Sequence, residues 1–156
     1  MATFGLAAIR TFAHGVAGLT DNDVAVEVRG SRAFTDGRTV VLPAEGLWDE
    51  GEFRALCGVA CHEIAHVWFR STGQLPALYQ QYTQAASARV QRAFNVVVDI
   101  ADETRFERAM PRAQALFAAA RELVLKEGLA SNSVSLNPSL AVPEDQLLAV
   151  GILWSR

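Results

Sequence analysis

The stretch that decides the fold is Cys61–Phe69, which reads Cys-His-Glu-Ile-Ala-His-Val-Trp-Phe. His62, Glu63 and His66 form an H-E-x-x-H motif within it. On a helix, histidines four residues apart project from one face, so both imidazoles can bind the same metal ion. Glu63 is then placed to take a proton from a metal-bound water. The chain has one further histidine, His14, and no other feature of the sequence is as informative about function.

A helix over residues 51–70 is expected to carry this motif. Its apolar side chains recur at helical spacing and form one stripe that suits the core. His62 and His66 fall opposite this stripe, so we expect the helix to turn them toward a polar cavity. The stripe consists of Phe53, Leu56, Cys57, Ala60, Ile64 and Val67.

The rest of the chain predicts more helices and a small β element. Alternating residues at 24–28 and a short apolar run at 39–42, with the turn signal Thr35–Gly37 before it, predict two strands that pair as a small antiparallel sheet. With no internal repeat, residues 1–156 are expected to form a single domain, α+β and mostly α. The other predicted helices cover residues 3–18, 84–110, 112–126 and 143–154.

The helix expected over 84–110 has an apolar side and an acidic side. We expect the apolar side to face the core. Without the two histidines, the acidic side would be interpreted as an ordinary solvated helix face. The apolar side contains Val90, Phe94, Val97 and Ala101, and the other side contains Asn95, Asp99, Asp102, Glu103 and Phe106.

That acidic side offers a third metal ligand. A catalytic zinc usually takes three protein ligands and keeps one position open for water. Because histidine is scarce in this chain, the third ligand is expected to be a carboxylate, and Asp99, Asp102 and Glu103 stand three and four residues apart. One of them can bind the ion while a neighbour orients a ligand histidine through its ring N–H. His14 is expected to be a structural histidine.

Composition narrows the class of protein. The net charge of −3 and the scattered basic residues give no reason to expect nucleic-acid binding. The N-terminus lacks the pattern of a signal peptide, and no apolar run has the length of a membrane span. Cys57 and Cys61, four residues apart on one expected helix, are interpreted as reduced thiols. We therefore expect a cytoplasmic protein.

Three segments, in this order, resemble a known family: Thr35–Pro43 (TDGRTVVLP), Ala60–Val67 (ACHEIAHV) and Asp99–Met110 (DIADETRFERAM). They are similar to the metallopeptidase domain of proteins named after the cobaltochelatase subunit CobT, many of them encoded by phages and often carrying a von Willebrand factor A domain. That family has a T-D-G turn, a strand ending in L-P, an A-H-E-x-x-H helix and a segment like N-x-x-E-D-x-R-x-E-R. The resemblance implies a zincin-like fold and a location in the bacterial or phage-infected host cytosol.

Position by position, the resemblance implies Asp102 as the third ligand, because it matches the family's glutamate. Glu103 matches the family's aspartate, and Asp99 matches its asparagine. The lengths of the two acidic side chains are thus swapped here, and an aspartate is one methylene shorter. Asp102 reaches the metal only where the two helices approach closely, so Asp99 and Glu103 remain alternates.

Two functions are compared. In the first, the protein hydrolyses a peptide or protein substrate. Zn²⁺ is held by His62, His66 and one acid, and Glu63 is the general base. The strand at 39–42 is then the candidate edge for pairing with the substrate. The alternative is a non-catalytic metal-binding module that partners a von Willebrand A domain or an AAA+ ATPase. A fourth protein ligand closing the zinc site would favour this module.

Overall fold

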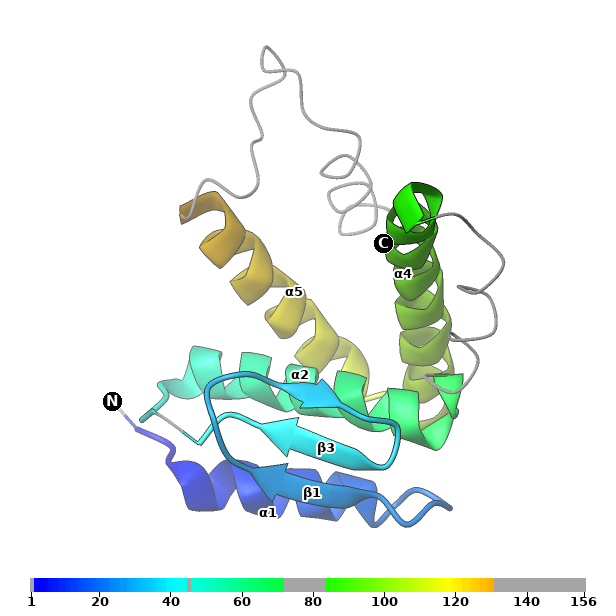
Figure 1. The fold of residues 1–156 in the computed structure, drawn as a ribbon. Helices are drawn as coiled ribbons and strands as arrows, with labels where there is room; N and C mark the ends of the chain where they lie inside the picture. Colours follow the sequence, from blue (N-terminus) through cyan, green and yellow to red (C-terminus); the bar gives the residue numbers. More distant parts are fainter. Residues whose placement is uncertain (1, 45, 72–83, 131–156) are drawn as a thin grey trace.

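The computed structural model describes residues 2–44, 46–71 and 84–130, with the backbone alone at 84–94 and 127–130. These residues form a mostly helical α+β fold, as predicted, with four helices and a small mixed three-stranded sheet (Figure 1). The helix expected over 143–154 lies outside the described residues. The elements are α1 (Leu6–Ala17), β1 (Ala25–Val28), β2 (Phe34–Thr35), β3 (Thr39–Leu42), α2 (Glu50–Trp68), α4 (Gln84–Ala109) and α5 (Ala113–Ala130).

The sheet corrects the expected antiparallel pair, because β1 and β3 run parallel. The antiparallel partner of β3 is β2, a strand of two residues that is too short to show alternation in the sequence. β2 and β3 form a hairpin, in whose turn Asp36 Oδ1 accepts hydrogen bonds from the backbone N–H groups of Arg38 and Thr39. The chain reverses direction before β2 and again at this hairpin, and two reversals leave β1 and β3 parallel.

The strand order β1-β3-β2 decides which strands have a free edge. β3 has a hydrogen-bonded neighbour on each side, so the expectation that residues 39–42 would pair with a substrate is wrong. Within the described residues, β1 and β2 are the two edge strands; β1 lies beside α1, and β2 lies beside α2.

Local contacts hold both ends of the motif helix α2. Asp49 is the N-cap, and it exchanges hydrogen bonds with Glu52 in a capping box. At the other end, the Asn22 side-chain amide donates to the carbonyl oxygen of Trp68 at 2.8 Å and satisfies an acceptor that the helix leaves unpaired. These contacts fix where α2 begins and ends, and thereby the placement of the motif.

α2 lies between two parts of the fold, with α1 and the sheet on one side and α4 and α5 on the other (Figure 1). Its expected apolar stripe is buried, except for Phe53, which is half-buried. A Cβ built on Gly58 would lie 2.1 Å from the carbonyl oxygen of Leu116, so α2 and α5 cross where no side chain separates them. Cys57 and Cys61 are buried free thiols, and burial raises the pKa of each to about 12.

α4 corrects the expected orientation of its faces. Val97 is 62% exposed, whereas Asp102 is 2% and Phe106 is 0% exposed. Phe106 packs edge to face against Phe117 of α5, with ring centroids 5.7 Å apart. The side of α4 that carries the acids therefore faces the protein. The other residues expected on the core side are Ala101, which is exposed, and Val90 and Phe94, whose side chains lie outside the description.

Candidate metal centre

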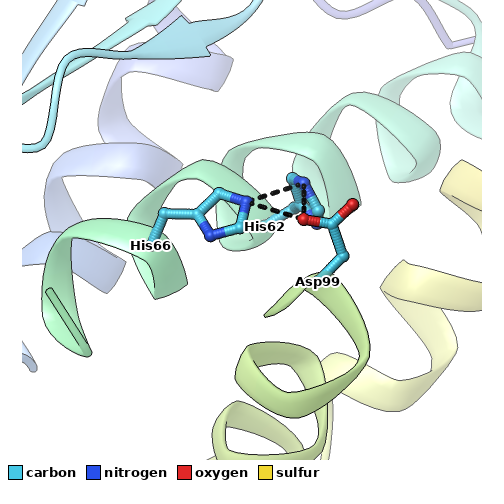
Figure 2. A group of neighbouring side chains, drawn as sticks. All are labelled: His62, His66 and Asp99. Carbon is cyan, nitrogen blue, oxygen red and sulfur yellow. Dashed lines mark hydrogen bonds and ion pairs between the residues drawn. The ribbon is translucent and has the colours of Figure 1, made fainter. Parts of the chain in front are cut away.

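Three side chains from two helices converge on one point (Figure 2). The Nε2 atoms of His62 and His66 lie 3.1 Å apart, as the four-residue spacing on α2 allows. Asp99 of α4 completes the group. Its Oδ1 lies 3.2 Å from Nε2 of His66 and 3.9 Å from Nε2 of His62.

These three atoms have the spacing of ligands around one small cation. The centre of the circle through the three atoms lies about 2.0 Å from each of them. This distance matches the bond length of zinc to histidine nitrogen or carboxylate oxygen. Two imidazoles and one carboxylate also form a donor set that zinc accepts. Three protein ligands leave a fourth position for water or substrate, as in catalytic zinc sites.

The other ring nitrogen of each histidine faces an acceptor. His62 Nδ1 lies 3.1 Å from Oε1 of Glu103. His66 Nδ1 lies 3.0 Å from Oδ2 of Asp102 and 3.1 Å from Oγ of Ser71. When Nδ1–H donates to a carboxylate, the lone pair is left on Nε2, which is the atom that points into the group. Carboxylate–histidine pairs of this kind are typical of metal-binding histidines.

Two arginines offset part of the negative charge. Arg121 of α5 donates to Oε2 of Glu103 at 2.6 Å and so links a third helix to the site. Arg105 lies 3.9 Å from Oδ1 of Asp102, but its side chain is 61% exposed and solvent weakens this pair. A carboxylate as buried as Asp102 is stable only with close partners, and His66 is its nearest one.

The pKa values of two residues reflect these surroundings. Burial by itself lowers the pKa of His66, but the carboxylates of Asp102 and Asp99 outweigh burial and raise it to about 9. Surroundings that favour a proton on this imidazole also favour a metal cation beside it. Burial raises the pKa of the Glu63 carboxyl, against the opposing effect of the imidazoles of His62 and His66. The higher pKa brings Glu63 closer to the range in which a general base works.

A cavity of about 300 Å³ adjoins the three ligand atoms. Glu63 lines it beside both histidines, and Phe34 and Thr35 line it from the edge strand β2. The cavity thus has room for a reactant between the candidate metal ligands, the Glu63 carboxylate and the edge of β2. Its lining consists of Phe34, Thr35, His62, Glu63, His66, Ser71, Asn95, Val98 and Asp99.

The structure gives different positions to the three carboxylates among which the sequence did not choose a third ligand. Asp99 joins the Nε2 pair of the histidines. Asp102 and Glu103 each face an Nδ1 atom, which is the orienting role expected for a neighbour of the ligand. The identity of the third ligand stays a prediction, and these distances favour Asp99 over Asp102.

Two residues of the site were not anticipated. Ser71 follows the end of α2, and Arg121 stands 18 residues after the glutamate that it contacts. A serine near a helix end is ordinary, and a contact between two helices leaves no local pattern in the sequence. No signal in the chain alone could have found Arg121.

Comparison with protein-family models, curated proteins and solved structures finds no match for this chain. Of the family resemblance, the structure supports one part: His62, His66 and Asp99 form a group that is suited to hold a metal ion. Among the described helices, none is long and apolar enough to cross a membrane. The assignment of function therefore rests on the geometry of the site.

Proposed function

We propose that the chain is a zinc-dependent peptidase of the zincin type, in which His62, His66 and Asp99 hold the ion and Glu63 is the general base. The observation that carries this proposal is that one point lies about 2.0 Å from all three donor atoms. In addition, the Nδ1 atom of each imidazole lies within hydrogen-bond distance of a carboxylate oxygen.

Each residue has a defined task in this chemistry. Zinc, when bound, supplies Lewis-acid polarisation of a substrate carbonyl and acidifies a water. Glu63 accepts a proton in the adjoining cavity and returns it to the leaving amine. Asp102 and Glu103 keep the two imidazoles in the tautomer and orientation that binding requires.

The position of the edge strand β2 supports a peptide or a protein as the substrate. β2 is one of the two edge strands of the described sheet, and both of its residues, Phe34 and Thr35, line the cavity that contains Glu63. An extended peptide can add to such an edge through main-chain hydrogen bonds. A peptide bound along β2 would pass beside the metal ligands, which favours a peptide or protein substrate over a small molecule.

The rival function is a non-catalytic metal-binding module that partners a von Willebrand A domain or an AAA+ ATPase. Such a module would close its zinc site with a fourth protein ligand. Within the described residues the ligand group contains three members, and a cavity adjoins it. This geometry favours the peptidase. We assign the protein to the cytoplasm, where its two buried thiols would stay reduced.

The test is Glu63→Gln, with zinc content and cleavage of a mixed peptide library both measured. Zinc content should stay at one ion per chain, while cleavage falls about 100-fold or more because the base is lost. A wild-type protein that binds no divalent metal rejects the proposal. A wild-type protein that binds zinc and cleaves no peptide favours the module instead.

A further inference from the structure

A second cavity, of about 350 Å³, lies between α2, α4 and α5. It shares His62 and Asp99 with the metal centre, so it opens directly beside the ligand group. Most of its wall is aliphatic or aromatic. The apolar residues that line it include Val59, Ile100, Phe117, Ala120 and Val124.

Apart from His62 and Asp99 of the candidate metal centre, the polar side chains that line this cavity carry no net charge. Arg121 and Glu103 both line the cavity, and they form an ion pair at 2.6 Å. Their charges offset each other, so the wall does not select a charged ligand. Phe117, which is 1% exposed, adds a phenylalanine to the lining on the α5 side.

The size of the cavity fits a large side chain. A cavity of about 150 Å³ is sufficient to bind benzene when its walls are apolar. The cavity beside the metal centre has about twice this volume. At the α2 side of the wall, Gly58 lies directly against the backbone of α5 at Leu116, and Ala120 contributes only one methyl group to the lining.

We propose that this cavity is a specificity pocket for a bulky apolar side chain, such as leucine, methionine or phenylalanine, next to the bond that is cleaved. The proposal rests on the proposed peptidase function, because it takes the peptide backbone to lie at the ligand group. With a carbonyl beside His62 and Asp99, a neighbouring side chain would point into the apolar wall. The chain would then cleave peptides next to apolar residues.

The experiment compares two hydroxamates, which share one metal-binding group. Acetohydroxamate carries a methyl group, and 3-phenylpropionohydroxamate carries an aromatic tail. Their affinities for the zinc-loaded protein are measured by titration calorimetry. The tailed compound should bind at least about tenfold tighter, since filling an apolar pocket discriminates by this order of magnitude. Equal affinities overturn the pocket.

Two matched variants locate the tail. Val124 is 55% exposed at the rim of the cavity, and Val97 is 62% exposed on α4 without lining it. Val124→Trp should fill the rim and reduce the gain from the tail at least threefold, whereas Val97→Trp should leave the gain unchanged. Because both valines are largely exposed, both variants should fold, which circular dichroism checks. An equal effect of the two variants overturns the pocket.

The outcomes separate this pocket from the peptidase function. A preference for the tailed hydroxamate, sensitive to Val124→Trp, supports the pocket even when no peptide is cleaved, and the peptidase assignment then fails alone. Cleavage of a peptide library without preference for apolar residues beside the bond rejects the pocket and leaves the peptidase intact. A protein that binds no zinc rejects both.

Discussion

α2 and α4 both supply candidate metal ligands, yet α2 buries its apolar side and α4 buries the side that carries its acidic residues. α2 turns its apolar stripe into the core and its histidines to the side, where they are only partly buried. α4 turns Asp102 inward at 2% exposure and leaves Val97 62% exposed. A helix that meets the core through apolar residues is oriented by hydrophobic burial, whereas α4 is oriented in part by charged partners.

The difference has a physical explanation. A buried carboxylate costs several kcal/mol unless it is paired and hydrogen-bonded. His66 provides such a partner for Asp102. For Glu103, the partners are His62 of α2 and Arg121 of α5, so these contacts link three helices. Phe106 adds apolar burial on the same side of α4. The acidic side of a helix can therefore be its inner side when the neighbouring helix presents imidazoles.

The largest expected effect tests the orientation of α4 directly. Phe106→Ala should lower the free energy of unfolding by about 3–5 kcal/mol, because it removes a fully buried ring. Val97→Ala on the same helix should change it by less than about 0.5 kcal/mol, because Val97 is mostly exposed. Urea unfolding measures both. A cost for Val97→Ala similar to that for Phe106→Ala would show that α4 faces the other way.

The second prediction separates the two aspartates of α4. Asp99→Ala should weaken zinc binding more than about 100-fold, since loss of a direct ligand exceeds the 10–100-fold effect of an orienting partner. Asp102→Ala should fall within that smaller range. His14→Ala, on the exposed side of α1, is the control and should have no effect. Competition with a chromophoric chelator gives the affinities, and the reverse order would return Asp102 to the role of third ligand.

A smaller effect tests the packing of α2. Gly58→Ala should destabilise the protein by about 1–3 kcal/mol, because the new methyl group meets the backbone of α5 at Leu116. Gly15→Ala in α1 is the matched control. A Cβ there has no atom within 4 Å, and alanine should stabilise the helix by about 0.5–1 kcal/mol. Thermal unfolding of both variants checks the contrast. A neutral Gly58→Ala would mean that α2 and α5 do not cross closely.

The smallest effect tests the most distant contact of the site. Arg121→Gln removes the guanidinium that pairs with Glu103, which in turn contacts the candidate ligand His62. Because this effect is indirect, zinc affinity should fall by less than about tenfold. Arg112→Gln, at an exposed position before α5, should leave the affinity unchanged. The chelator competition assay used for the aspartates applies here too. A loss as large as that of Asp99→Ala would place Arg121 much closer to the chemistry than its contacts indicate.

The parts of the fold that sequence patterns predicted are those determined by neighbours along the chain. The position of α2, its buried stripe and the exclusion of its histidines from that stripe follow from helical spacing. The pattern failed for β2, where two residues cannot show alternation, and for the direction of β1 relative to β3. It failed at Val97 because hydrophobic periodicity assigns acids to solvent and takes no account of imidazole partners.

The sequence by itself determined two candidate ligands and a candidate base: His62 and His66 lie four residues apart on a helix, and Glu63 lies beside them. Only the tertiary structure decided which acid of α4 meets their Nε2 atoms. It also decided which strand edge and which apolar pocket adjoin the site. The reason is physical. Spacing along one helix is set by local backbone geometry, whereas contacts between helices depend on how close they pack, and at Gly58 one missing side chain sets that distance.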